Sequence, residues 1–206
     1  MLIDVLRHGE PVGGARYRGR TDDVLTERGW QQMAGAVKPV PSWTRIISSP
    51  LRRCAEFATQ LSEEHRLELH IEPRLAEIDF GDWEGLTSQQ IMDCDAGRLL
   101  QYWNDPHNIT PPNGEPLTMF KSRVTSAWHD LHSQHLSATR PTIGHREEHL
   151  LVVTHGGTLR MILSNILQIP HSALFTIDVP YACLSRFQAQ GDCEQSRLIF
   201  HNGRLT

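Results

Sequence analysis

The sequence predicts an α/β protein of three layers, in which a mostly parallel sheet is flanked by helices. Two segments, 2–6 and 149–154, are short continuous apolar runs rich in Leu, Ile and Val, as is typical of strands buried on both faces. Helix-like segments alternate with strand-like ones, which favours parallel strands joined through helices. The length of 206 residues, with 39% hydrophobic and 21% charged residues, fits a single globular domain spanning 1–206.

The first half of the chain predicts two strands, each followed by a helix. After the first strand, an arginine-rich loop leads to Thr26, a residue type that caps helices, and a helix is expected over about 27–37. RIISS (45–49) is the second strand. The Pro50 that follows it is typical of a first helical turn, so the helix that carries LRRCAEFATQL is expected to begin there.

The second half predicts a helical excursion and then a return to the sheet. A strand is expected near 68–71, and helices near 86–103 and 116–136 lie within an excursion at about 78–137. The buried strand at 149–154 follows, and then a helix. Two alternating segments, ACLSRFQ and SRLIFHN, are separated by the turn AQGD, and they predict a closing antiparallel pair.

Composition and charge argue against several classes of partner. The net charge of −4 leaves no footprint for nucleic acid, and no apolar run reaches the length of a membrane span. Met1 leads directly into the first strand with no basic leader segment, so a cytoplasmic location is expected. The cysteines form no CxxC pair and are expected to be reduced thiols: Cys54, Cys94, Cys183 and Cys193.

Two histidines follow the two buried strands. His8 comes directly after the first strand and its Arg7, and His155 directly follows the strand at 149–154; each is followed by glycine. Ligands of open α/β sheets bind at the carboxyl ends of strands. If the two strands are neighbours, the two imidazoles meet at one place.

A third strand end adds positive charge. RIISS leads into a helix with Arg52 and Arg53 in its first turn, and a helix N-terminus with arginine attached can bind an anion. Together the histidines and arginines suggest a phosphate pocket built without a metal. Taken singly, each has a structural alternative: a histidine at a strand end usually serves packing, and a first-turn arginine is usually solvated.

Four segments resemble, in the same order, the motifs of the histidine phosphatase superfamily, also called phosphoglycerate mutase-like. They are Arg7-His8-Gly9-Glu10, SSPLRRCAEFA (48–58), LAEIDFGDWEG (75–85) and THGG (154–157). PPNGEPLTMFKSRV (111–124) is similar to the phosphatase branch. With FGDWEG, it most resembles the enzymes that act on α-ribazole 5′-phosphate in cobalamin synthesis.

The resemblance implies a role for each matching residue. It implies that His8 is the nucleophile and becomes phosphohistidine, and that Arg7 and Arg53 bind the phosphate. His155 is the second histidine, which can donate another hydrogen bond. Glu77 is the acid that protonates the leaving group, with Glu84 as the next candidate. Asp79 and Asp82 of the same loop are the other rival carboxylates.

The sequence departs from the family after the first motif. Many members continue with Ser or Thr and later Asn, whereas residues 11–14 here are Pro-Val-Gly-Gly. Arg18, Arg20 and Thr21 are the candidates to replace those phosphate contacts. The loop that holds Arg16, Arg18 and Arg20 is either solvated or a lid on the phosphate side.

These residue types suit phosphoryl transfer. Charge spreads over the equatorial oxygens in the transition state, so positive charge and positioning supply most of the catalysis. Arginine offers planar paired donors that lysine does not. His8 must attack with a neutral nitrogen, so its other nitrogen needs an acceptor, for which the Gly9 carbonyl is a candidate.

Two further groups of residues have less specific patterns. His129, His132 and His135 recur at helical spacing, with His145 and His149 beyond them, but no spacing completes a zinc site, and no metal or other cofactor is expected. Four aromatic residues either pack a core or form a wall for a base-like leaving group, with Trp83 and the neighbouring Glu84 as expected substrate contacts: Phe80, Trp83, Tyr102 and Trp103.

The sequence therefore predicts a metal-independent phosphomonoesterase. Its partner is a small-molecule phosphate monoester, most favourably α-ribazole 5′-phosphate, and not nucleic acid or a membrane; a homodimer stays open. A broad-specificity phosphatase and a mutase of the same fold are the alternatives among enzymes. A catalytically silent binding module is the alternative outside them.

Overall fold

A computed structural model describes residues 1–40, 43–138, 148–189 and 196–205, with the backbone alone for 133–138. A six-stranded sheet runs through its centre in the order β3-β2-β4-β1-β5-β6. Neighbouring strands among the first four in this order are parallel, whereas β5 is antiparallel to β1 and β6 to β5. The strands are β1 (Leu2–Arg7), β2 (Arg45–Ser48), β3 (Glu68–Ile71), β4 (His149–Thr154), β5 (Leu184–Gln188) and β6 (Arg197–Phe200).

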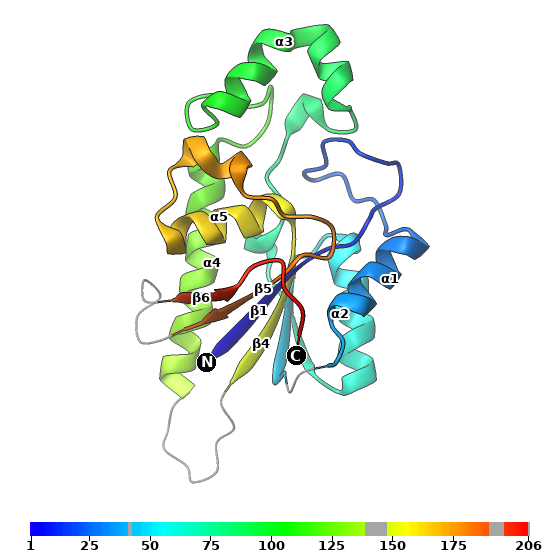
Figure 1. The fold of residues 1–206 in the computed structure, drawn as a ribbon, viewed down its shortest axis with the longest axis vertical. Coiled ribbons are helices and arrows are strands. Elements are labelled where there is room, and N and C mark those ends of the chain that lie inside the picture. The colour runs from blue at the N-terminus through cyan, green and yellow to red at the C-terminus, as the bar shows by residue number, and fades with distance from the viewer. Residues whose placement is uncertain (41–42, 139–147, 190–195, 206) are drawn as a thin grey trace.

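Helices cover both faces of the sheet, as the sequence predicts (Figure 1). The helices α1 (Glu27–Ala36) and α2 (Arg52–His65) lie on one face, and α4 (Leu117–Ala138) and α5 (Gly156–Leu167) on the other. Alternate residues of β4 enter different cores: Leu151 and Val153 pack with α1 and α2, and Leu150 and Val152 with α4 and α5. Burial on both faces explains the continuous apolar runs.

One helix stands apart from the sheet. The helix α3 (Ser88–Asn104) lies beyond the other layers in Figure 1 and has a small core of its own: Trp83, Ile91, Leu99 and Tyr102. The sequence placed α4 in the same excursion, but α4 contributes to the core that contains α5. Short 3-10 helices complete the chain: η1 (Pro73–Leu75), η2 (Gly81–Trp83) and η3 (His171–Thr176).

Local interactions fix several of the expected boundaries. The Thr26 side chain accepts a hydrogen bond from the Gly29 amide at 2.9 Å and caps α1. Most of the predicted turn AQGD, together with Cys193 and His145, lies outside the described residues. No helix in the described part of the chain is both long and apolar enough to cross a membrane.

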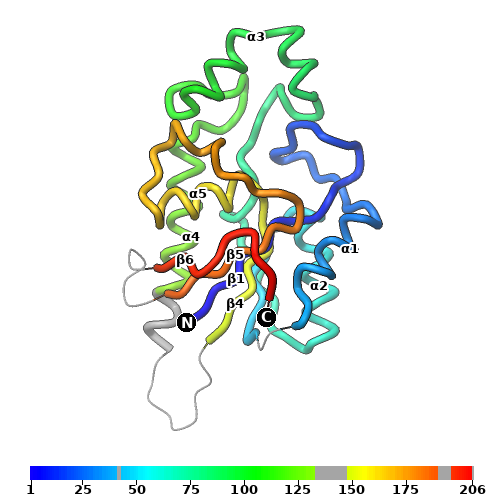
Figure 2. The backbone as a smooth tube through the Cα atoms, viewed as in Figure 1, coloured from blue at the N-terminus to red at the C-terminus, as the bar shows by residue number. Residues whose placement is uncertain are grey.

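The loop between β1 and α1, residues 12–24, is held by hydrogen bonds at its base and at its tip. Its base is closed by a bridge between Pro11 and Leu25. Its tip pairs with the segment that leads into α3, where the Tyr17 amide donates to the Leu86 carbonyl at 2.9 Å. The trace in Figure 2 shows this loop beside that segment, above the carboxyl ends of the parallel strands.

Candidate active site

The strand order brings the two histidines together. β1 and β4 are parallel neighbours with Arg7 opposite Thr154, so His8 and His155 leave the sheet side by side. Their rings meet edge to face, with centroids 5.2 Å apart. The predicted adjacency of the two buried strands is confirmed.

The His8 ring is held in one tautomer. Its Nδ1 lies 2.7 Å from the Gly9 carbonyl oxygen. A carbonyl only accepts, so Nδ1 carries the proton and Nε2 keeps a free lone pair. Burial, reinforced by the charges of Arg7 and Arg53, holds the pKa of His8 well below its usual value. The imidazole is therefore neutral at pH 7.

The two arginines beside His8 are oriented mainly by backbone carbonyls. Arg7 donates from Nη1 to Val179, and its guanidinium carbon lies 4.4 Å from the centre of the Tyr181 ring. Arg53 is fully buried and donates to the carbonyls of Gly19 at 3.0 Å and Thr21 at 2.7 Å.

Each of these arginines keeps one buried donor free. Among the described residues, neither the Nε of Arg7 nor that of Arg53 has a hydrogen-bond partner. A buried donor without a partner costs free energy, which an anionic ligand would recover.

His155 is fully buried beneath His8. Its Nε2 lies 2.6 Å from the Ser49 hydroxyl, and the Cys54 sulfur is 3.7 Å from the same nitrogen. Burial, together with Arg53 and His8, keeps the pKa of His155 well below its usual value. The imidazole is thus neutral and oriented by a serine of the SSP motif.

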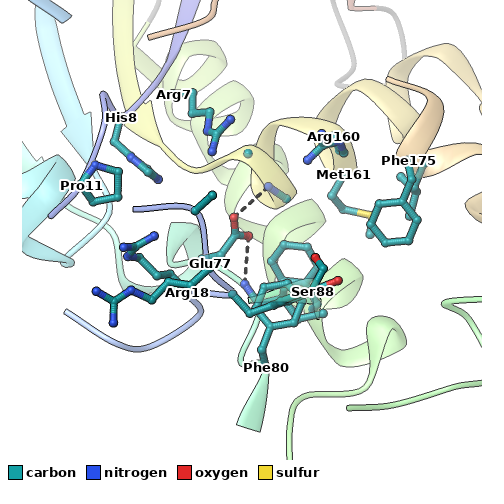
Figure 3. Close-up of a pocket in the computed structure, with 18 of the residues that line it drawn as sticks. Arg7, His8, Pro11, Arg18, Glu77, Phe80, Ser88, Arg160, Met161 and Phe175 are labelled. Carbon is teal, nitrogen blue, oxygen red and sulfur yellow. Dashed lines mark hydrogen bonds between the residues drawn. The ribbon is translucent and has the colours of Figure 1, made fainter. Parts of the chain in front are cut away.

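Glu77 is fixed at the start of α5. One oxygen accepts from the Gly157 amide at 2.9 Å and the other from the Ile78 amide at 3.0 Å, as the dashed lines in Figure 3 mark. A Cβ at position 157 would lie 2.3 Å from a carboxylate oxygen of Glu77, so a side chain there would displace that carboxylate. The carboxylate faces the same cavity as His8 and Arg7.

The start of α2 differs from the expectation. The Arg52 amide donates to the Asp22 carboxylate at 2.6 Å, so a protein carboxylate takes the predicted anion position. The Arg52 side chain pairs with Glu56 at 2.7 Å on the surface. Only the second arginine of the pair, Arg53, turns inward to His8.

Glu84 holds the loop and does not face the reaction centre. Its oxygens accept from the amides of Arg20, Thr21 and Phe80 at 2.7, 2.6 and 3.2 Å, and from the Thr21 hydroxyl. Burial raises the pKa of Glu84, but these hydrogen bonds outweigh it and keep the pKa below its usual value. Glu84, Arg20 and Thr21 do not line the cavity, and their expected contact with substrate stays a prediction.

A cavity of about 360 Å³ opens in front of His8. Arg16 and Arg18 of the loop line this cavity, whereas Arg20 does not. Arg18 is buried, and its Nε forms an ion pair with Asp23 at 2.7 Å. The rest of the wall is largely apolar and aromatic: Tyr17, Phe80, Tyr102, Phe120, Met161, Leu174 and Phe175.

The aromatic wall is not centred on Trp83. Trp83 is buried in the small core beside α3, and Trp103 donates from its indole nitrogen to the Tyr17 hydroxyl at 2.9 Å on the outside. Phe80 and Tyr102 line the cavity instead. Trp83 is buried in that core and does not line the cavity, whereas Tyr102 belongs to the same core and also lines the cavity.

Two of the histidines between positions 129 and 149 make structural contacts: His132 on α4 and His149 on β4. The Nδ1 of His132 lies 2.8 Å from the Trp128 carbonyl oxygen, and its Nε2 lies 2.8 Å from the Ser196 hydroxyl. The Nε2 of His149 lies 2.9 Å from a carboxylate oxygen of Asp4. Within the described ranges, no three potential ligands from His, Cys, Asp and Glu gather as a metal site. The side chain of His135 lies outside those ranges.

Sequence reasoning missed three residues of the site: Ser49, Tyr181 and Arg160. Ser49 stands in a quoted motif, but its contact with His155 depends on strand adjacency. Tyr181 precedes β5, whose place beside β1 no local pattern indicates. Arg160 had a usable signal, since it lies one helical turn after Gly156 on the helix that follows His155.

Comparisons with known proteins agree with this geometry. A family model described as the histidine phosphatase superfamily (branch 1) matches residues 3–201. The chain is 32% identical to a glucosyl-3-phosphoglycerate phosphatase of Mycobacterium tuberculosis over 81% of this chain and 75% of that protein. It is 28% identical to the adenosylcobalamin/alpha-ribazole phosphatase of Escherichia coli, over 90% and 88%.

The solved alpha-ribazole phosphatase from Shigella flexneri superposes with a TM-score of 0.82 at 26% identity, covering 99% of this chain and 97% of that one. Other relatives are longer. The chain spans about half, 54%, of mycobacterial proteins to which it is 30% identical over 98% of its own residues.

Proposed function

This chain belongs to the histidine phosphatase superfamily, branch 1, and on that premise we propose that it hydrolyses phosphate monoesters with His8 as the nucleophile. One observation carries the proposal. The free Nε2 of His8 stands beside two arginines that each keep a buried Nε donor without a partner. A phosphoryl group placed there would meet both donors and the attacking nitrogen together.

In the first step, the Nε2 lone pair of His8 attacks phosphorus and the ester P–O bond breaks. The leaving oxygen takes a proton from Glu77, which releases the free alcohol and leaves phosphohistidine and a carboxylate. The positively charged guanidinium groups of Arg7 and Arg53 donate hydrogen bonds to the equatorial oxygens and offset their negative charge. His155 is the proposed donor of a further hydrogen bond to the phosphoryl group.

In the second step, water attacks phosphorus and the P–N bond of phosphohistidine breaks. Glu77 takes the proton of that water, so the enzyme returns to its starting state and inorganic phosphate leaves. The hydrogen bonds from the Ile78 and Gly157 amides support this double role, because they keep the Glu77 carboxyl group in one position in both steps.

α-Ribazole 5′-phosphate is the substrate that we propose. The named relatives include alpha-ribazole phosphatases, and the aromatic side of the cavity suits a flat benzimidazole base. The glucosyl-3-phosphoglycerate phosphatases are a second indication from the relatives, which keeps a sugar acid phosphate as the alternative.

A substrate screen tests this proposal. Release of inorganic phosphate is measured with α-ribazole 5′-phosphate, 3-phosphoglycerate, glucosyl-3-phosphoglycerate and p-nitrophenyl phosphate, with His8→Ala as the blank. We expect kcat/KM to be highest for α-ribazole 5′-phosphate. Isomerisation of 3-phosphoglycerate without release of phosphate would indicate a mutase, and no turnover of any ester would indicate a binding module.

A further inference from the structure

One cation in the cavity has no part in the proposed chemistry. Arg160 lies on α5 and lines the cavity, with its Nε donating to the Ile177 carbonyl at 2.9 Å. Figure 3 shows its guanidinium on the same side of the cavity as that of Arg7. The anchor at Nε fixes the side chain and leaves its two terminal nitrogens for other partners.

Arg160 and Arg7 are close neighbours. A Cβ built on Gly156 would lie 3.2 Å from Nε of Arg7 and 3.5 Å from Nη1 of Arg160. The absence of a side chain at Gly156 therefore leaves room for the Arg7 guanidinium at the first turn of α5, with the Arg160 guanidinium beside it. The charge of Arg160 adds to burial, the main cause, in lowering the pKa of Arg7.

No carboxylate in the described part of the chain forms an ion pair with Arg160. Glu77 is the acidic residue of the cavity wall, and two backbone amides hold its oxygens. Two adjacent cations repel each other, and the phosphate proposed at His8 balances only the one that binds it. A second anionic group would balance the other.

The surroundings restrict what that second group is attached to. Met161 follows Arg160 directly and lines the same cavity, and Tyr102, Leu174 and Phe175 complete an apolar wall. Phe175 packs against Tyr102 with ring centroids 5.6 Å apart and the two ring planes tilted by 54°, so two aromatic faces border the cavity. Such a wall suits a ring and does not hydrogen-bond a charged group.

We propose that Arg160 is a specificity-determining residue that binds a carboxylate on a ring-containing leaving group. The proposal rests on the proposed phosphatase function and adds a second substrate class beside α-ribazole 5′-phosphate, which has no acidic group besides the phosphate. That class is phosphate esters whose alcohol carries both an aromatic ring and an acidic substituent. Arg7 holds the phosphate, and Arg160 holds the acid.

Two matched esters test the subsite. We compare 3-carboxyphenyl phosphate with 3-carbamoylphenyl phosphate, which has the same shape without the charge, in the unmodified protein, Arg160→Gln and Arg160→Lys. A hydrogen-bonded ion pair contributes about 1.5–3 kcal/mol, so Arg160→Gln should lower kcat/KM for the carboxylate ester by about 10- to 100-fold. The amide ester should change by less than about threefold, and Arg160→Lys should be intermediate.

Arg98→Gln is the matched control, because it removes an arginine charge on the surface of α3, where Arg98 pairs with Asp95. It should leave both esters unchanged. Equal losses for both esters in Arg160→Gln would mean that Arg160 serves the phosphate, and no loss for either would mean that it contacts neither. Each of these results overturns the proposal.

A binding measurement separates the subsite from the reaction. By calorimetry, 3-hydroxybenzoate should bind the unmodified protein at least tenfold more tightly than 3-hydroxybenzamide does, and Arg160→Gln should abolish the difference. If neither ester is hydrolysed but this difference is found, the phosphatase function fails and the anion subsite stands. Equal binding of the two probes would overturn the subsite alone.

Discussion

Glu77 rests on Gly157: the carboxylate accepts a hydrogen bond from the glycine amide at 2.9 Å, at a position where any Cβ would collide with it. The proposed acid and the helix that follows His155 are thereby joined. Because the contact depends on the absence of a side chain, it can be broken without changing the acid itself.

Glu77→Gln should slow phosphoenzyme formation by about 10²- to 10⁴-fold with an alkyl phosphate, which needs a proton on its leaving oxygen. With p-nitrophenyl phosphate the same step should slow much less, because nitrophenolate departs without a proton. Rapid-quench measurement of the first turnover separates this step from hydrolysis of the phosphoenzyme. Equal slowing for the two esters would leave Glu77 as a structural or binding residue.

Gly157→Ala should reproduce that pattern more weakly, because the added methyl group displaces the carboxylate but does not remove it. The same rapid-quench comparison of the two esters checks it. Gly35→Ala on α1 is the control, since a Cβ at Gly35 meets nothing within 4 Å. Unchanged selectivity between the esters in Gly157→Ala would disconnect the glycine from acid catalysis.

His8→Ala should abolish turnover and the formation of acid-labile phosphoprotein together, because the unprotonated Nε2 is the proposed nucleophile. Labelling with ³²P-substrate and acid quench measures both. His129→Ala, on the exposed side of α4, should label normally. If the His8 variant still labels at the normal rate, another histidine is the nucleophile.

Arg53→Lys should reduce kcat/KM far more than Arg52→Lys. Arg53 is buried, and its planar fork meets two carbonyls while keeping Nε free, whereas Arg52 lies on the surface with Glu56. Steady-state kinetics on p-nitrophenyl phosphate compares the two. Equal losses, or the reverse order, would place the phosphate contact at Arg52.

Stability should fall in acid through a site far from the reaction. Asp4 is fully buried and receives two hydrogen bonds from Arg186, at 2.7 and 2.9 Å, and others from His149 and Trp43, each at 2.9 Å. Burial alone would raise the pKa of Asp4, but these partners outweigh it and hold the pKa below its usual value.

A lowered carboxyl pKa means that the unfolded chain binds the proton first. The contribution of Asp4 is therefore complete above its unfolded pKa of about 4, and it is lost as the pH falls through the folded value. Asp4→Asn should lower the free energy of unfolding at pH 7 by about 3–5 kcal/mol and flatten its slope below pH 4. Urea unfolding from pH 7 to 2.5 measures both, and an unchanged slope would exclude Asp4 as the cause.

The strands and helices were predictable because each is determined by residues that are close together in the sequence. Continuous apolar runs mark β1 and β4, and Thr26 marks the start of α1. The meeting of His8 and His155 followed from one assumption, that two buried parallel strands are neighbours.

The errors concern contacts between segments far apart in the chain. Glu84 and Glu77 lie in one acidic segment, and only the path of the loop decides that Glu84 binds the amides of Arg20 and Thr21. Similarly, Asp22 reaches the start of α2 across thirty residues. Nothing local distinguishes a carboxylate that caps from one that reacts.

The support of Arg53 by the carbonyls of Gly19 and Thr21 limits how this pocket can diversify. The loop that borders the leaving group also supplies the two carbonyls that orient Arg53. A change in loop length near these carbonyls that admits a new substrate would therefore also move Arg53. Residues 13–15 are exposed and lie before this shared stretch. Insertions there can vary the entrance while leaving the reaction centre intact, whereas insertions between Gly19 and Thr21 would alter both at once.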